Sequence, residues 1–289
     1  MSILRIPSHR GPNRSGADPG GNSGKGLLYA VAKGFPWMDV LKYGVVMAAM
    51  AWLMIRGTEQ LGYHWHWYRI PRYLFTFEEG GLTLGLLLQG LKVTLAISGI
   101  SLALSFFFGL FTALLRLSPS FIGRIVARGY LEIIRNTPLL VQIFLIYFVL
   151  GPILGMERFT SAILALSLFE GAYASEIFRS GIVSIEKGQW EAAYSLGLNT
   201  IQSYRTVILP QAVRRILPPL AGQAVSLVKD SALVSTIAIF DLTMQGQAIV
   251  AETYLTFEIW FTVAGLYLLI TVLLSMTVRV MEKRFRIHA

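Results

Sequence analysis

Six long apolar runs divide the sequence, and they constrain its fold more than any other feature. A helix that crosses the hydrocarbon core of a bilayer needs about 20 predominantly apolar residues. Of the 289 residues, 54% are hydrophobic and only 14% charged, whereas soluble proteins carry roughly 25% charged residues. The sequence therefore predicts an all-α integral membrane protein with about six transmembrane helices. These spans are expected near residues 41–56, 86–115, 125–150, 161–180, 216–240 and 259–279.

The distribution of Lys and Arg predicts how these spans are oriented. Cytoplasmic segments of membrane proteins carry an excess of Lys and Arg. If the N-terminus is cytoplasmic, the inside segments hold seventeen of these residues and the outside segments hold four. We therefore expect both termini in the cytoplasm. The segment "YHWHWYRIPRY" (63–73) then lies in an outer loop, where its aromatic residues suit a membrane interface.

The chain divides into a tail, an extra span and a larger membrane domain. Gly, Pro, Ser and basic residues dominate residues 1–36, which predicts a basic, disordered cytoplasmic tail. Residues 37–81 hold the extra N-terminal transmembrane helix and the aromatic outer loop, and 82–289 hold the other five spans. We expect "EEGGLTLGLLLQG" (78–90) to form an interfacial helix that leads into the second span.

The polar stretch "EAAYSLGLNTIQSYRTVILP", from Glu191 to Pro210, interrupts this apolar chain. Glu191 is expected in the first turn of a short helix, where a carboxylate favours the positive end of the dipole. Ala192 and Ala193 are small enough to let another surface approach closely. Gly197 is expected to end the helix with a positive φ.

A second short helix is expected to follow this glycine. Asn199 and Gln202 have the spacing of a capping box, and Pro210 cannot continue the hydrogen-bond ladder of the helix. The alternative is a helix that only packs against lipid. Interfacial helices of that kind usually carry bulky apolar and basic residues, so the small surface with one acid favours a protein partner.

This stretch resembles the EAA loop of ABC-importer permeases, whose pattern is E-A-A, three residues, G, nine residues and I-x-L-P. Val207 stands in place of the isoleucine. Three further segments resemble the branch of this family that moves polar amino acids: "IRNTPLLVQIFLIYF" (134–148), "GAYASEIFRSGI" (171–182) and "VILPQAVRRILPPL" (207–220). The resemblance covers roughly residues 82–286. The positions that match the EAA pattern are Glu191, Ala192, Ala193, Gly197, Leu209 and Pro210.

The resemblance implies a type I importer permease with a five-helix core, here preceded by one extra helix. It implies a coupling loop at 186–210 that docks on a separate ABC ATPase dimer, which binds ATP and Mg while this chain binds no cofactor and is not itself catalytic. It further implies a second permease subunit, the same or a related chain, and a periplasmic or surface amino-acid-binding protein. The location implied is the bacterial cytoplasmic (inner) membrane, in contact with lipid.

Ionisable and polar residues within spans are costly there, and they are functional candidates. Glu170 lies near the middle of its span, and Tyr173 follows on the same helix face. Lys229 and Asp230 are adjacent, so they point about 100° apart on a regular helix and need separate partners unless the helix is irregular there. These four residues and Gln142 are substrate-path candidates. For each, a hydrogen bond or packing role between helices is the alternative.

Two local ion pairs and a proline pair complete the expectations for these spans. Glu176 with Arg179, and Glu132 with Arg135, have the i, i+3 spacing that stabilises helix ends. Pro218 and Pro219 are expected in the first turn of their span, where proline is tolerated.

Other classes of protein fit the sequence less well. An ATP-independent secondary transporter or channel is the alternative, but the inverted repeats common in such proteins are not evident. The chain has no cysteine, and its four histidines, His9, His64, His66 and His288, form no metal-ligand or catalytic cluster. A tail motif, "GGNSGKG", fails the phosphate-loop pattern because Pro19 occupies its first glycine position. The net charge of +9 lacks the basic stripe expected of a nucleic-acid-binding domain.

Overall fold

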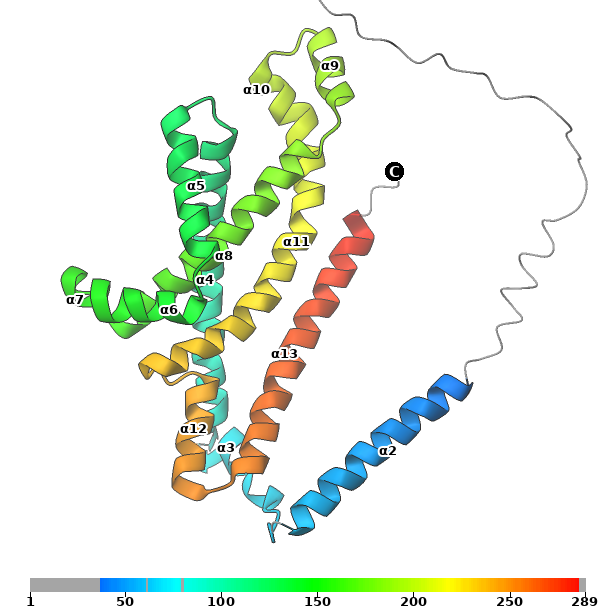
Figure 1. Cartoon of the computed structure of the whole chain (residues 1–289), viewed down its shortest axis with the longest axis vertical. Coiled ribbons are helices and arrows are strands. Elements are labelled where there is room, and N and C mark those ends of the chain that lie inside the picture. Colours follow the sequence, from blue (N-terminus) through cyan, green and yellow to red (C-terminus); the bar gives the residue numbers. More distant parts are fainter. Residues whose placement is uncertain (1–36, 61, 79–80, 286–289) are drawn as a thin grey trace, which may run out of the picture. The chain divides into compact units, whose positions relative to one another are not determined.

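The computed structural model describes residues 37–60, 62–78 and 81–285, and most of them are helical (Figure 1). The chain divides into two compact units, and the boundary in the sequence lies between His64 and Trp65. The first contains helix α2 (Trp37–Gln60), which is long and apolar enough to span a bilayer. The predicted tail at 1–36 lies outside the described residues.

The second unit holds the remaining elements in a bundle of helices with one small hairpin. Its elements in chain order are η1 (Trp67–Arg69), α3 (Pro71–Leu74), β1 (Phe75–Glu78), β2 (Gly81–Leu84), α4 (Leu86–Leu117), α5 (Phe121–Arg135), α6 (Leu139–Phe144), η2 (Leu145–Leu150), α7 (Gly151–Leu154), α8 (Arg158–Val183), α9 (Lys187–Ser195), α10 (Thr200–Ser203), η3 (Tyr204–Ile208), α11 (Leu209–Asp230), η4 (Ser231–Ile237), α12 (Leu242–Thr253) and α13 (Thr256–Phe285).

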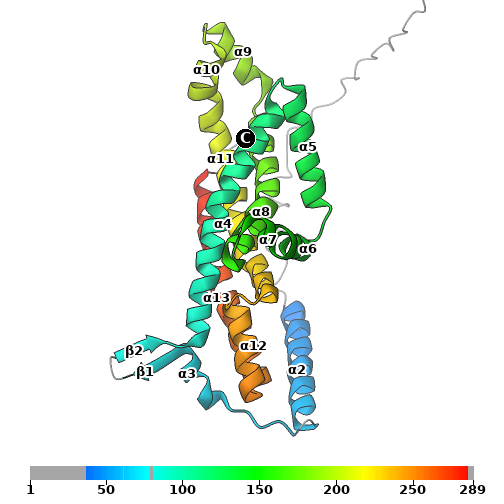
Figure 2. The same ribbon diagram turned by 90° about the vertical axis from the view of Figure 1, so that its left-hand side faces the viewer.

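The interfacial helix predicted before the second span is wrong, because a β-hairpin precedes α4. Strands β1 and β2 pair antiparallel, with Phe75 opposite Leu84 and Glu78 opposite Gly81. Gly81 has a φ of +121°, a conformation that glycine adopts without steric cost. The hairpin lies beside α3 at one end of the second unit (Figure 2), and α4 begins directly after it.

The span predicted at 125–150 is broken rather than continuous. Helix α5 and the segment Leu139–Leu154 meet at a bend of 108°. Pro138 explains the break, because it lacks an N–H and disfavours a helical conformation at the residue before it. The side chain of Gln142 closes the bend: its Nε2 donates to the carbonyl oxygens of Ile134 at 2.7 Å and Thr137 at 3.0 Å.

The span predicted at 216–240 has different limits and a different interior. Helix α11 starts at Leu209, and it ends at Asp230, where the chain changes to the 3₁₀ turn η4. Pro218 and Pro219 lie inside α11 rather than in its first turn, so that prediction is wrong. Helix α12, which follows η4, was not predicted.

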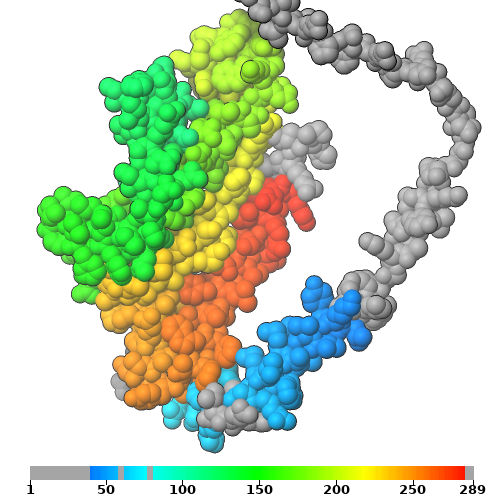
Figure 3. All heavy atoms as spheres, viewed as in Figure 1, coloured from blue at the N-terminus to red at the C-terminus, as the bar shows by residue number. Residues whose placement is uncertain are grey.

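Helices α4 and α8 pack against each other through small residues. Ser101, Ser105 and Gly109 recur at helical spacing on the buried face of α4. A β-carbon built at Gly109 would lie 2.7 Å from Cβ of Ala174 and 3.0 Å from the carbonyl oxygen of Gly171, both on α8. Small residues allow membrane helices to approach this closely. Helix α11 contacts α8 on one side and α13 on the other (Figure 3).

Candidate functional site

Helix α9 and the turn after it project from one end of the second unit, between α8 and α11 (Figure 1). Glu191 is exposed on α9. The prediction that Glu191 lies in the first turn of this helix is wrong. The helix begins four residues earlier, at Lys187, so Glu191 lies in its second turn. Ala192 is exposed, whereas Ala193 is buried. The motif therefore leaves Glu191 and Ala192 exposed and uses Ala193 for internal packing.

Gly197 ends α9 as predicted, with a φ of +74°. The N–H of Gly197 donates to the carbonyl of Tyr194 at 2.9 Å, and that of Leu198 donates to the carbonyl of Ala193 at 3.2 Å. These two bonds form a Schellman motif, which satisfies carbonyl groups at the end of the helix. The direction of the turn thus depends on a residue that tolerates left-handed backbone.

The capping box predicted at the next helix is confirmed. The N–H of Gln202 donates to Oδ1 of Asn199, and the N–H of Asn199 donates to Oε1 of Gln202, both at 2.9 Å. The two rings of Trp190 and Tyr204 lie 4.8 Å apart, edge to face. This aromatic contact holds α9 against the start of the next helix, so the two helices form a fixed elbow.

The predicted stop at Pro210 is wrong, because helical structure runs from Thr200 to Asp230. Residues Tyr204–Ile208 form a π-helical turn, in which the N–H of Leu209 donates to the carbonyl of Tyr204. Leu209 and Pro210 then form the first turn of α11, where a missing N–H costs little. The last two motif positions therefore join the elbow to α11.

Glu170 and Asp230 lie side by side although they are sixty residues apart. Glu170 is buried in α8, with 2% of its surface exposed, and its carboxyl lies beside that of Asp230 at the end of α11. Oε2 of Glu170 is buried and has no hydrogen-bond partner among the described residues. Lys229 is exposed. Lys229 and Asp230 both lie within the regular helix α11, and the 3₁₀ structure begins only at Ser231.

The other two substrate-path candidates lie elsewhere. The ring of Tyr173 lies 5.7 Å from the guanidinium carbon of Arg135, in a different environment from Glu170. Gln142 spans the bend between α5 and α6. The structure therefore separates the candidates into a carboxyl pair, an aromatic–arginine contact and a bend.

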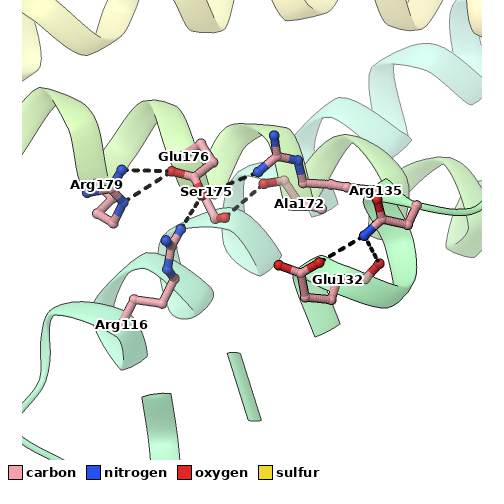
Figure 4. A network of polar contacts seen from close by, with 8 residues as sticks. Arg116, Glu132, Arg135, Ala172, Ser175, Glu176 and Arg179 are labelled. Carbon is pink, nitrogen blue, oxygen red and sulfur yellow. Dashed lines mark hydrogen bonds and ion pairs between the residues drawn. The ribbon is translucent and has the colours of Figure 1, made fainter. Parts of the chain in front are cut away.

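Glu176 forms ion pairs with arginines from three helices (Figure 4). The predicted pair with Arg179 is confirmed, with Oε2 of Glu176 3.0 Å from Nη2. Oε1 accepts from Nη1 of Arg116 on α4 and lies 3.5 Å from Nη1 of Arg135 on α5. The predicted pair of Glu132 with Arg135 is wrong. Oε2 of Glu132 accepts from the amide of Asn136 at 2.9 Å instead.

With this geometry established, comparison with known proteins identifies the family. Residues 105–287 match the family described as "Binding-protein-dependent transport system inner membrane component". The chain belongs to this family. It is a multi-pass membrane permease of the ABC-importer type. Permeases of this type work with an ATPase, which uses ATP, and with a second permease.

Several characterised permeases resemble the chain over most of their length. It is 42% identical over 205 residues to the glutamine transport system permease GlnP of Escherichia coli K12. This match covers 70% of this chain and 94% of GlnP. The chain is 38% identical over 207 residues to the nopaline permease NocM of Agrobacterium fabrum, covering 68% and 86%. It is 42% identical over 187 residues to the L-cystine permease TcyB of Bacillus subtilis, covering 63% and 80%.

Solved structures agree with this membership. A chain in the crystal structure of an amino acid ABC transporter with histidines is 39% identical, with a TM-score of 0.65; the match covers 69% of this permease and 94% of that chain. An inward-facing MetNI methionine ABC transporter is 21% identical, with a TM-score of 0.59, covering 70% and 97%. The second comparison supports the fold of the permease alone. The matched family region begins after α2.

Proposed function

We propose that this chain is the transmembrane permease subunit of an ATP-driven importer of polar amino acids in the bacterial cytoplasmic membrane. Residues 82–289 form its ABC permease domain, and the loop 186–210 is its coupling element. Both termini lie in the cytoplasm. Its partners are an ABC ATPase dimer that binds ATP and Mg, a second permease subunit, and a periplasmic or surface amino-acid-binding protein.

The observation that carries this proposal is the continuity between the elbow and the buried carboxyl pair. Helical structure leads from Thr200, beside α9, to Asp230, whose carboxyl lies against Glu170. A movement of α9 on the ATPase would therefore move α11 and change the surroundings of Asp230. The movement would pass from the elbow to the Glu170–Asp230 pair along helical backbone, without a series of side-chain rearrangements between them.

The exposed surface of the elbow suits a protein partner. Beside Glu191, the large apolar side chains of Tyr194, Leu196 and Ile201 are 48%, 79% and 79% exposed. A cluster of this kind, with one acid, offers apolar contact area and a charge that fixes the register of docking. Bulky apolar residues also occur on membrane-surface helices, contrary to the small surface expected from the sequence, so the acidic Glu191 is what favours a protein partner here, because such helices carry basic residues beside the apolar ones.

The carboxyl pair provides acceptors for the ammonium group of an amino acid. The free Oε2 of Glu170 and the adjacent carboxyl of Asp230 can accept hydrogen bonds from –NH₃⁺, and the exposed Lys229 offers a cation for the carboxylate. Tyr173 is a weaker candidate because its ring already contacts Arg135. The Nε2 of Gln142 is used at the bend, but its buried Oε1 has no hydrogen-bond partner among the described residues and is a further candidate acceptor. The names of the relatives include glutamine and cystine, which supports amino acids as the substrate class.

The test is uptake by the complex reconstituted in liposomes with its ATPase and binding protein. Glu191→Lys should leave ATP hydrolysis measurable but abolish ATP-driven uptake, while Glu191→Gln should have a smaller effect. Glu252→Lys, a charge reversal on the exposed surface of α12, is the control and should transport normally. Normal uptake by Glu191→Lys would refute the coupling role. Uptake without any ATPase would instead indicate a secondary transporter or channel.

A further inference from the structure

A polar cavity of about 300 Å³ lies between α4, α5 and α8, next to the Glu176 network (Figure 4). It is small, at the lower end of the range of about 300–1,000 Å³ for ligand pockets. Charged and hydrogen-bonding side chains dominate its wall. Its lining residues are Arg116, Arg128, Leu131, Glu132, Arg135, Asn136, Tyr173 and Glu176.

The charges in this cavity do not balance. Three guanidinium groups line it and only two carboxylates, and Glu176 already holds Arg116. Arg128 has no hydrogen bond or ion pair within the described part of the chain. A network that only fastened the three helices would not need it. The unpaired guanidinium leaves the cavity with a site for an anion, and a guanidinium matches a carboxylate well.

The same helix face also offers an acceptor. Glu132 follows Arg128 by four residues, so the two side chains lie on one face of α5. One oxygen of Glu132 accepts from Asn136, and among the described residues the other oxygen accepts nothing. A cation site and an anion site thus lie one helical turn apart. This arrangement matches the two charged groups of a free amino acid.

We propose that this cavity binds an amino acid on its way out of the permease. Arg128 and Arg135 bind its carboxylate, and Glu132 binds its ammonium group. Glu176 lies six residues after Glu170 on α8, which is about 9 Å along the helix toward α9. The cavity is therefore a second binding site, which lies between the Glu170–Asp230 pair and the end of the bundle that carries the elbow. This inference rests on the proposed function, because the elbow marks the release side.

The experiment measures amino-acid binding to the purified permease–ATPase complex in neutral detergent, without binding protein. The double variant Glu170→Gln and Asp230→Asn serves as background, so that the deeper pair does not contribute. Each standard amino acid is tested, together with the carboxamide of the one that binds best. We expect at least one amino acid to bind, and its carboxamide to bind at least tenfold more weakly.

Variants on α5 then assign the binding to the cavity. Arg128→Gln should weaken binding at least tenfold, Glu132→Gln should weaken it as well, and Arg128→Lys should keep part of it. Arg124→Gln is the matched control, because Arg124 lies one turn earlier and donates to the carbonyl of Ser118 outside the cavity. Co-purification of the ATPase shows that each variant is folded.

Two results would overturn the inference. One is that no amino acid binds in the background variant. The other is that binding persists unchanged in Arg128→Gln, or is displaced by anionic phospholipid rather than by free amino acid. If the wild-type complex transports normally and either binding result is obtained, the second binding site alone is refuted. A complex that shows no ATP-dependent uptake would refute the proposed function instead.

Discussion

Gly181 on α8 lies directly against Ile216 on α11. A β-carbon built at Gly181 would stand 2.2 Å from Cγ1 of Ile216, which is far inside van der Waals contact. This crossing lies two residues before the end of α8 and seven residues after the start of α11. The two helices on either side of the elbow are thus locked together where they leave it.

The first prediction concerns this crossing. Gly181→Val should force α8 and α11 apart at a cost of about 1–3 kcal/mol, and so lower the midpoint of thermal inactivation of the purified permease. Gly129→Val on α5, where a β-carbon meets nothing within 4 Å, is the control and should have little effect. Equal stability of the two variants would show that the crossing is not tightly packed.

The second prediction concerns the turn after α9. Gly197→Val places a β-branched residue at a φ of +74°, which costs at least about 1–2 kcal/mol, and should change the angle between α9 and α10. ATP hydrolysis should continue while ATP-driven uptake falls. Gly188→Val, in the first turn of the same helix and with open space around it, should keep both activities. A Gly197→Val complex with normal uptake per ATP would contradict a fixed elbow.

The third prediction concerns the capping box. Asn199→Ala removes the acceptor for the Gln202 N–H, and loss of such a cap costs about 1 kcal/mol. Hydrogen exchange at Gln202 should then become roughly fivefold faster, since that free energy corresponds to this factor in local opening. Asn199→Asp keeps the acceptor and should exchange at the wild-type rate. Unchanged exchange in the alanine variant would mean that other contacts hold the turn.

The fourth prediction concerns the buried carboxyl pair. Glu170→Gln replaces one carboxyl oxygen with an amide nitrogen, which cannot accept a hydrogen bond from the ammonium group of the substrate, and a hydrogen bond to a charged group contributes about 1.5–3 kcal/mol. The apparent KM for uptake should rise about tenfold or more for the transported amino acid. Glu157→Gln, at the exposed start of the same helix, should leave uptake kinetics unchanged. Unaltered kinetics for every amino acid would exclude Glu170 as a substrate contact.

Local signals in the sequence predicted local structure well. Gly197, Asn199 and Gln202 gave the turn and the capping box, because each acts on backbone groups within a few residues. The long apolar runs predicted α4, α8 and α13, because a membrane-spanning helix is recognised from about 20 consecutive, predominantly apolar residues. The bend at Pro138 was missed although its signal was present, since the apolar pattern on both sides suggested one continuous span.

Contacts between distant residues were not predictable in the same way. Glu176 lies 60 residues from Arg116 and 41 from Arg135, and only the packing of three helices brings them together. The i, i+3 rule gave the Arg179 contact and wrongly paired Glu132 with Arg135. Pro218 and Pro219 were wrongly expected in the first turn of a helix. Inside a packed membrane helix, groups of neighbouring elements compensate for a missing N–H, and the sequence does not show where such packing occurs.

The π-helical turn at Tyr204–Ile208 has a consequence for rotational phase. Such a turn holds one more residue than an α-helical turn, and each residue rotates a helix by about 100° while advancing it by about 1.5 Å. Inserting or deleting one residue between Ile208 and Asp230 would therefore turn Asp230 away from Glu170 with almost no change in length. The count of residues between the elbow and Asp230 sets which way that carboxyl points.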